Sequence, residues 1–502
     1  MKKIYIISII ALMLFSIEGC KKDFLDVQPT EFLTDQQVAE AAKNNPAVIA
    51  GSVSGIYTLM FQTGTGGTAE DLDHDDFGQK GYDIFSDFLS SDLALSVTTY
   101  GWYRRLTEYT VTTDYTNTGN LKPWTYYYKI IRSTNLVISA LGGNDVVPEL
   151  DENKHLMGQA KAMRAYSYFY LTQFYATSYD PTTEILPIYT DPAQPNQPKS
   201  TTQDVYTLIT KDLTDAISLL DTFERTAKNQ VNKYVAEGLL AYTYAVMGGN
   251  DNYGKAKDLT ADIISNGGFT LMDSTEVVYT GDPTIGGFNN VNTPGWMWGV
   301  DITTDNGLDL VSWWGQMDRF TYSYQWAGDR KAIDQGLYDK IPANDVRKAQ
   351  FEIGSENPYY LCPSNKFYDP NRKTGGQRNV ITDYVYMRVA EMYLLNAETA
   401  AKSGDEVTAK ASLKALVSNR MANANYIDNL SGQGLLDEIY LQTRIELWGE
   451  GKSYLAMKRN HATIVRGSNH LSFVGVPVPY DDPRLTFSIP QNEIQNNPFI
   501  NN

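Results

Sequence analysis

The sequence predicts a mostly α-helical protein: a tetratricopeptide-like scaffold of about four helical pairs, interrupted by a loop-rich, irregular region. Three observations predict this architecture. Apolar residues recur at helical spacing in several segments. Short glycine breaks separate two of these segments from a second helical stretch. A long stretch in the second half of the chain then loses helical periodicity and gains glycine, asparagine, aspartate and tryptophan.

The helical pairs are clearest around the glycine breaks. One helical segment ends at Gly248-Gly249 and resumes over 253–265, and another ends at Gly404 and resumes over 406–420. Small residues alternate with bulky ones in these pairs, as the close packing of antiparallel helices requires. Further helices are expected at 36–60, 123–141, 155–177 and 203–221. Together these segments make about four pairs.

Two stretches do not continue the helical pattern. Residues 178–200 hold five prolines, which predict an extended connector. From about 270 to 383 the chain is expected to be irregular with short strands, and long segments of this kind tend to carry function. We therefore divide the mature chain into an N-terminal helical region (20–270), a loop-rich insert that is the candidate ligand-binding region (271–383), and a C-terminal helical region that completes the scaffold (384–502).

The N-terminus has the layout of a lipoprotein signal peptide over residues 1–19. Lys2 and Lys3 precede a short apolar run, and Gly19 stands directly before Cys20. The run is too short to span a bilayer. We expect cleavage before Cys20 and acylation of its side chain, which would anchor the protein to a membrane that it does not cross. The alternative is an ordinary secretory peptide with a chance cysteine.

Composition narrows the class of ligand. A formal net charge of −17 argues against nucleic acid or another polyanion as partner. The 35 tyrosines and 8 tryptophans offer flat apolar faces with polar edges, which suit sugars but also suit buried cores. After acylation of Cys20 only Cys362 remains, so no intramolecular disulfide can form and stability must come from core burial.

Motifs for catalysis and metal binding are incomplete. A phosphate loop would need glycine where Glu446 stands, and the helical spacing over 441–455 predicts one buried helix there. The acidic stretch 71–76 lacks the EF-hand glycine, which leaves a solvated acidic loop or, alternatively, a looser cation site. The four histidines have no zinc-protease spacing. We expect no catalytic residue, no metal and no cofactor.

Tryptophans give the best local signal for a binding site. Five of the eight lie between 296 and 326, and Tyr322 and Tyr324 stand among them. An indole face can stack on the apolar face of a pyranose, and stacking of this kind contributes about 1–3 kcal/mol per ring in nucleic-acid complexes. The alternative is core packing in a region that lacks regular structure. The candidate ligand-binding residues are Trp102, Trp296, Trp313, Trp314 and Trp326.

Five landmarks, taken in order along the chain, resemble one known family. They are Cys20 to Asp26; Trp124 with Tyr128, Ile131 and Asn135; Arg164-Ala165-Tyr166 through to Leu186-Pro187; Arg388 to Glu398; and Ile489 to Ile494 with Asn497-Pro498. Together they resemble the SusD/RagB family of Bacteroidetes surface lipoproteins over almost the whole chain. One landmark departs, because Lys452 follows Glu450-Gly451 where the family often has arginine. This departure weakens any inference about the ligand.

The resemblance implies a fold and a function. It implies a helical tetratricopeptide-like scaffold, a loop-rich region that binds a nutrient, usually a glycan, and a site to which the insert around Trp102 contributes. It also implies an outer-membrane location facing the cell exterior and a SusC-like TonB-dependent transporter as partner. The expected function is capture of an oligo- or polysaccharide, without chemistry of its own. The alternatives are a peptide receptor of the RagB type, a glycoside hydrolase with two carboxyl groups across a cleft, and a purely structural assembly protein.

Overall fold

The computed structural model describes residue 41 and residues 45–500. The predicted signal peptide, Cys20 and residues 36–40 and 42–44 of the helix expected at 36–60 lie outside these residues. Within the described part of the chain, no helix is both long enough and apolar enough to cross a membrane.

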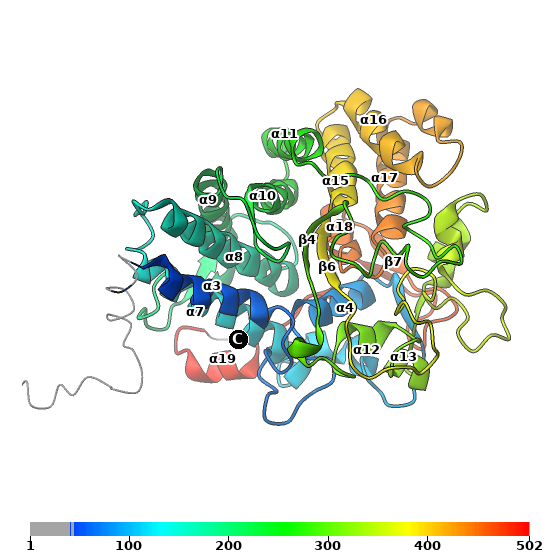
Figure 1. Ribbon diagram of the computed structural model, residues 1–502, viewed down its shortest axis with the longest axis horizontal. Helices are drawn as coiled ribbons and strands as arrows, with labels where there is room; N and C mark the ends of the chain where they lie inside the picture. Colours follow the sequence, from blue (N-terminus) through cyan, green and yellow to red (C-terminus); the bar gives the residue numbers. More distant parts are fainter. Residues whose placement is uncertain (1–40, 42–44, 501–502) are drawn as a thin grey trace, which may run out of the picture.

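The scaffold is a row of helices in which each packs against the next (Figure 1). They run in the order α7 (Thr118–Ala140), α8 (Asp151–Tyr175), α9 (Thr202–Leu219), α10 (Lys233–Met247), α11 (Asn250–Asn266), α15 (Val389–Lys402) and α16 (Glu406–Val417). At the two ends of the row, α3 (Pro46–Leu59) packs on α7 and α8, and α17 (Gly432–Glu446) packs on α15. The predicted tetratricopeptide-like helical fold is confirmed.

The predicted glycine breaks are confirmed as the turns between paired helices. Gly248 and Gly249 separate α10 from α11 with φ angles of 69° and 83°, and Gly404 separates α15 from α16 with a φ of 86°. These are left-handed conformations, which glycine adopts without the steric cost that a Cβ imposes. The chain can therefore reverse within two residues and bring the second helix back along the first.

The predicted insert 271–383 is built of short elements on long connections. It contains β4 (Trp296–Val300), α12 (Trp313–Met317), α13 (Tyr324–Ala327), β5 (Arg330–Ile333) and α14 (Gln335–Lys340). Antiparallel ladders tie it to the rest: β4 pairs with β6 (Tyr384–Arg388), and β5 pairs with β1 (Leu93–Val97). Because α11 packs directly on α15, the scaffold continues past the insert. The division at 270 and 383 remains a proposal.

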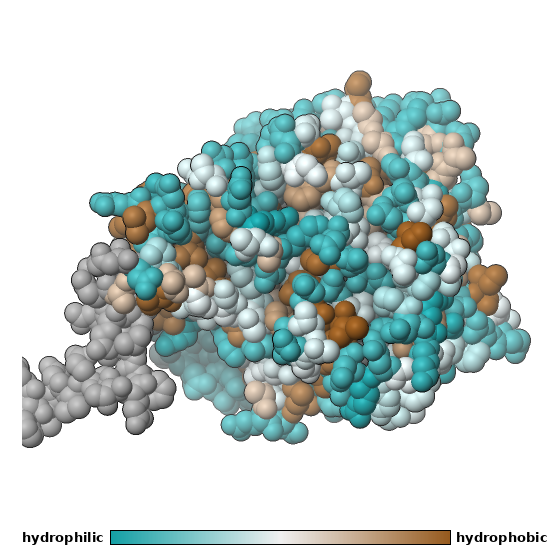
Figure 2. All heavy atoms as spheres, in the orientation of Figure 1, coloured by the Kyte–Doolittle hydropathy of each residue, from teal (hydrophilic) through white to brown (hydrophobic). Residues whose placement is uncertain are grey.

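The remaining short elements lie mainly between the scaffold helices and at the C-terminal end. The helices are α4 (Gln79–Leu89), α5 (Arg104–Thr107), α6 (Thr110–Thr113), α18 (Ser453–Arg459) and α19 (Gln491–Asn496). The strands are β2 (Glu184–Pro187), β3 (Lys199–Thr201), β7 (Thr463–Val465) and β8 (Pro477–Pro479). The pairs β2–β3 and β7–β8 are both antiparallel. The face seen in Figure 2 carries small, scattered hydrophobic patches on a mostly hydrophilic surface.

The single helix predicted over 441–455 is wrong. The chain breaks between α17 and α18, where Gly449 and Gly451 have φ angles of 78° and 74°. A Cβ would lie 2.5 Å from the ring of Phe367 at the first glycine and 2.6 Å from Asp83 at the second. Close approach by residues far away in the sequence therefore sets this break, and the apolar spacing alone could not reveal it.

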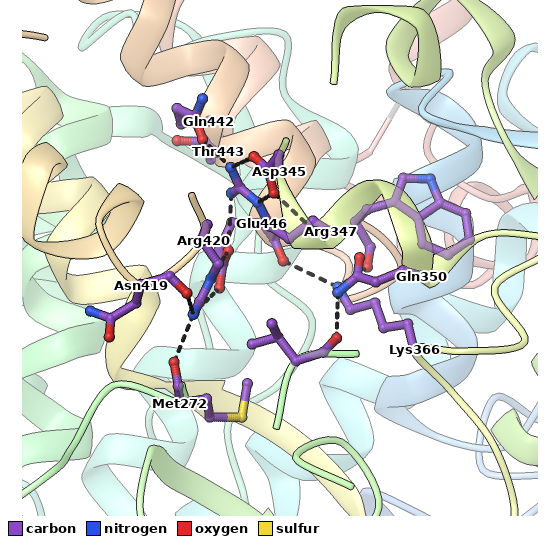
Figure 3. A network of polar contacts seen from close by, with 12 residues as sticks. Met272, Asp345, Arg347, Gln350, Lys366, Asn419, Arg420, Gln442, Thr443 and Glu446 are labelled. Carbon is purple, nitrogen blue, oxygen red and sulfur yellow. Dashed lines mark hydrogen bonds and ion pairs between the residues drawn. The ribbon is translucent and has the colours of Figure 1, made fainter. Parts of the chain in front are cut away.

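A buried charge cluster, defined here as Glu446, Glu450 and their cationic partners, joins the scaffold to the insert. Glu446 on α17 accepts hydrogen bonds from Arg347 (3.0 Å), Arg388 (2.7 Å) and Arg420 (2.8 and 2.9 Å). Figure 3 shows Arg347 and Arg420 converging on this carboxylate from separate segments. Burial alone would raise the pKa of Glu446, but the guanidinium groups hold it well below its usual value. The cluster therefore fixes three chain segments on one carboxylate.

Candidate ligand-binding site

Three of the five predicted tryptophans are core residues. Trp296 and Trp314 are 0% exposed and Trp313 is 3% exposed. Trp296 donates to the Gly287 carbonyl (2.7 Å) and Trp314 to that of Asp383 (3.3 Å), while Trp313 packs edge-on against Phe367. No ring face is left for a ligand, so these three residues do not form stacking platforms. The insert 271–383 has short elements joined by long connections, and large aromatic side chains fill the space between them, since protein interiors are closely packed.

Trp102 and Trp326 remain at the surface. Trp102 is half-buried, with its ring stacked on His74 at 5.0 Å and 2° between planes, and it also contacts Tyr324 at 6.0 Å. Tyr100 is 60% exposed and stands edge-on to Tyr324 at 5.4 Å. We call His74, Tyr100, Trp102 and Tyr324 the aromatic cluster. It brings together rings from three separate segments of the chain.

Trp326 lies beside the aromatic cluster in sequence, on the same short helix as Tyr324. Its side chain is 37% exposed and contacts Tyr322 at 5.7 Å. A Cβ on Gly375 would lie 2.5 Å from its ring, so the indole packs directly on that glycine and keeps part of its surface open. Arg378 lies over Tyr322 and pairs with Asp309 at 2.9 Å, which adds hydrogen-bonding groups next to exposed rings.

The β1–β5 ladder explains why these rings meet. Leu93 pairs with Ile333 and Val97 with Arg330, so the end of β1 lies beside the start of β5. The loop 98–102 leaves β1 at that point, and α13 enters β5 at the same point. An antiparallel pair places such flanking segments side by side. Tyr100 and Trp102 therefore reach Tyr324 although more than 220 residues separate them.

Asp329 holds the loop 98–102 in place. Its buried carboxylate accepts hydrogen bonds from the backbone N–H groups of Thr99 (2.6 Å), Tyr100 (2.8 Å) and Trp102 (3.1 Å). Gly328, with a φ of 129°, allows this contact, because a Cβ there would lie 2.3 Å from the Thr99 hydroxyl. The hydrogen bonds to this carboxylate come from the loop itself. They fix the positions of Tyr100 and Trp102 in the absence of a ligand, so binding would not have to order them.

His74 completes the cluster as a neutral ring. Its Nδ1 lies 2.5 Å from the Tyr324 hydroxyl, and Gln316 donates to its backbone carbonyl at 2.7 Å. Burial lowers the pKa of His74, and this effect outweighs the opposing influence of Asp73 and Asp75. The imidazole is uncharged at neutral pH. The cluster thus presents uncharged aromatic faces with polar edges.

The acidic stretch 71–76 differs from the expected solvated loop. Asp73 and Asp75 both pair with the buried Lys122, at 2.6 and 2.5 Å, and Asp76 is fully buried and accepts from the Gly66 N–H at 2.9 Å. Among residues 45–500, no group of three or more histidine, cysteine or acidic side chains is arranged to hold a metal ion. These carboxylates shape the loop that carries His74.

Sequence reasoning missed His74 and Tyr100 as partners of Trp102. Tyr100-Gly101-Trp102 is a local signal, since two aromatics flank a glycine in a polar stretch. The role of Asp329 has no local signal, because the ladder that places it joins distant segments. Of the five predicted residues, the structure leaves Trp102 and Trp326 available, and only Trp102 belongs to the aromatic cluster.

Comparison with protein-family models gives two matches that together cover more than half of the chain. A model described as "Starch-binding associating with outer membrane" matches residues 81–245, and the model of the SusD family matches residues 347–502. Among curated proteins no relative matches the chain.

Solved structures share the fold over nearly the full length. A SusD-like carbohydrate binding protein from Bacteroides vulgatus is 23% identical, with 90% of this chain and 97% of that chain covered and a TM-score of 0.72. A SusD superfamily protein from Bacteroides thetaiotaomicron is 24% identical, with 90% and 98% covered and a TM-score of 0.71. With the two family models, these findings establish that the chain belongs to the SusD/RagB family.

Proposed function

We propose that the protein binds an oligo- or polysaccharide at the aromatic cluster and delivers it to a SusC-like TonB-dependent outer-membrane transporter. The observation that carries this proposal is the exposed Tyr100 beside the half-buried Trp102, both packed on the buried Tyr324 and held in place before binding. A sugar ring presents an apolar C–H face that stacks on such rings, while its hydroxyls need the polar groups at their edges. The uncharged His74 adds a further ring nitrogen to this surface.

Membership of the SusD/RagB family supports the class of ligand and the partner. One structural neighbour is described as a SusD-like carbohydrate binding protein, which agrees with a glycan as ligand. The partner transporter and the exterior-facing position at the outer membrane are inferred from the family. Anchoring through acylated Cys20 completes the proposal, since one or two lipid chains hold a protein at a membrane without spanning it.

Catalysis has little support in this cluster. The nearest carboxylate to the loop 98–102, that of Asp329, already accepts three backbone N–H groups, and Asp73 and Asp75 are paired with Lys122. A glycoside hydrolase needs two free carboxyl groups facing each other across the substrate. We therefore propose a binding protein that carries out no hydrolysis.

A glycan array followed by a sugar-release assay tests the function. We expect binding to one class of neutral glycan, with no reducing ends released over hours at the same protein concentration. Binding that stays nearly constant between low and high salt would fit stacking on an uncharged ligand, since screening weakens only charge-based contacts. Preferential binding of peptides, or release of sugar, would overturn the proposal in favour of the RagB-type receptor or the hydrolase.

The lipid anchor has its own test. Cys20→Ala should leave an exported but water-soluble protein, because the variant loses its lipid chains and no described helix is long and apolar enough to cross a bilayer. Fractionation of cells that lack the transporter partner measures this directly, with the wild-type chain as control. Retention of the variant in the membrane fraction under these conditions would contradict anchoring through Cys20.

A further inference from the structure

A cavity of about 230 Å³ lies in the scaffold, away from the aromatic cluster. It is bounded by the C-terminal ends of α8 and α10, the N-terminal ends of α9 and α11, and the chain at and after α18. In Figure 1, α9 and α10 lie at the upper left and α13 at the lower right, so the two places are well separated. The cavity and the aromatic cluster share no residue.

The floor of the cavity is polar and its rim is aromatic. On the floor, the Tyr206 hydroxyl lies 3.0 Å from the Thr172 hydroxyl and accepts from the Gln173 amide at 3.1 Å. On the rim, His461 is exposed and stacks on Tyr480 with ring centroids 4.2 Å apart and 10° between planes. Tyr179 and Tyr253, both half-buried, also line it. Rings around hydroxyl and amide groups suit a molecule with both an apolar face and polar edges.

The charge of the lining is opposite to that of the whole chain. Lys458, Arg459 and His461 line the cavity, and none of its lining residues is an aspartate or glutamate, although the chain carries a net charge of −17. Behind the wall, the single carboxylate of Glu398 serves two cations, Arg459 at 2.9 Å and Lys402 at 2.8 Å. Burial lowers the pKa of Lys458 to about 7, so this lysine is only partly protonated at neutral pH, but the two cations around Glu398 still leave the local balance positive, which favours an anion.

Arg459 also has an unused hydrogen-bond donor. Its Nε and one terminal nitrogen bind Glu398 (3.0 and 2.9 Å), whereas Nη1 has no hydrogen-bond partner among the described residues although the side chain is only 4% exposed. Lys458 differs, since it donates to the carbonyls of Gln173 and Ala176. A buried donor without an acceptor is costly, so a ligand acceptor placed beside Arg459 would gain a charge-assisted hydrogen bond.

We propose that this cavity is a second ligand site, which binds a small carboxylated sugar of the size of one uronic acid. The carboxylate would lie toward Arg459, and the sugar ring would lie against the aromatic rim near His461 and Tyr480. The volume equals that of about eight water molecules at roughly 30 Å³ each, which is the space of one sugar ring. The site goes beyond the proposed binding of a neutral glycan and does not depend on it.

Titration of the purified mature protein with D-glucuronate, followed by calorimetry or NMR, tests the site, with D-glucose as the neutral control. Glucuronate should bind about tenfold or more tightly than glucose, because only the acid can pair with Arg459. His461→Ala should weaken glucuronate binding at least about threefold, through loss of a rim ring. His155→Ala, a half-buried histidine at the other end of α8, is the matched control and should bind like wild type.

Arg459→Lys keeps the positive charge but replaces the planar guanidinium, which can donate several hydrogen bonds in one plane, by a single ammonium group. It should therefore weaken glucuronate binding about tenfold or more. Because this change also disturbs the pair with Glu398, its thermal unfolding midpoint is measured alongside, and His461→Ala decides the question if Arg459→Lys does not fold. Equal affinity for glucose and glucuronate, absence of glucuronate binding at millimolar concentration, or wild-type binding by a folded His461→Ala variant would each overturn the proposal. None of these results bears on the aromatic cluster.

Discussion

The buried charge cluster and the aromatic cluster both join chain segments that are far apart in sequence, but they do so with opposite exposure. Glu446 is 2% exposed and its three arginine partners are no more than 1% exposed, so the charges are closed off from solvent. In the aromatic cluster Tyr100 is 60% exposed, and its position depends on Asp329 beneath it. The same chain thus uses charge to fix its segments and leaves rings at the surface.

This difference in exposure predicts which substitutions should affect folding and which should affect binding. A buried charge that loses its partner keeps its desolvation penalty without compensation, which destabilises the fold strongly. An exposed ring contributes little to the core, so its loss should be felt mainly by a ligand. Stability and affinity should therefore respond to separate sets of residues.

The largest effect is expected from Glu446→Gln. This change leaves the buried Arg420 without a carboxylate partner and takes one partner each from Arg347 and Arg388, which keep Asp345 and Glu450, and breaking such a cluster costs about 3–5 kcal/mol. The thermal unfolding midpoint should drop markedly. Glu108→Gln removes the exposed pair with Arg104 and serves as control, with little change expected. Equal midpoints for the two variants would remove the distinction between buried and exposed charge in this protein.

A similar loss of stability is expected from Trp314→Ala, and it sharpens the division between core and site tryptophans. Because Trp314 is fully buried, its truncation should leave a cavity and cost about 3–5 kcal/mol. The affinity of the folded variant for its glycan should stay within about twofold of wild type. Calorimetric titration below the unfolding midpoint measures this. Loss of affinity without loss of stability would show that Trp314 contributes to ligand binding and not to the core.

A smaller, pH-dependent effect is expected at Lys331, a buried charge close to the aromatic cluster. Its Nζ donates to Gln316 (2.7 Å) and to the Asp329 carbonyl (3.0 Å), and burial lowers its pKa to about 7 despite the nearby Asp329. Between pH 7 and 10.5 the unfolded chain binds this proton more than the folded chain, so this group's contribution to stability rises with pH.

Lys331→Met removes that dependence. The difference in unfolding midpoint between Lys331→Met and wild type should therefore shift in favour of the wild type as the pH rises from 7 to 9. Thermal unfolding followed by circular dichroism at three pH values measures this difference. Lys340→Met, at an exposed position, is the matched control and should show a constant difference. A constant difference for Lys331→Met as well would mean that Lys331 keeps its proton in the folded state over this range.

Regular helices could be predicted from the sequence because their information is local. Apolar spacing located the scaffold helices, and the glycines at 248, 249 and 404 located their turns. The break between α17 and α18 could not be predicted, since Phe367 and Asp83 impose it from distant segments. Spacing that fits one helix also fits two helices with a turn between them.

The site was harder to predict than the fold for a related reason. Aromatic residues in an irregular segment have no period that separates inward from outward side chains, so Trp313 and Trp314 could not be distinguished from Trp326. The partners of Trp102 depend on a strand ladder between β1 and β5, which sequence spacing does not reveal. Only the neighbouring Tyr100 could have been proposed from local pattern.

The most direct test of glycan binding at the aromatic cluster is calorimetric titration of Tyr100→Ala and Trp102→Ala with an oligosaccharide selected on the array. Each variant should lose about 1–3 kcal/mol of binding free energy, roughly 5- to 150-fold in Kd, with an unfolding midpoint close to that of wild type. Tyr115→Ala, an exposed tyrosine outside the cluster, should bind like wild type. Wild-type affinity in folded Tyr100→Ala and Trp102→Ala proteins would contradict binding at this cluster.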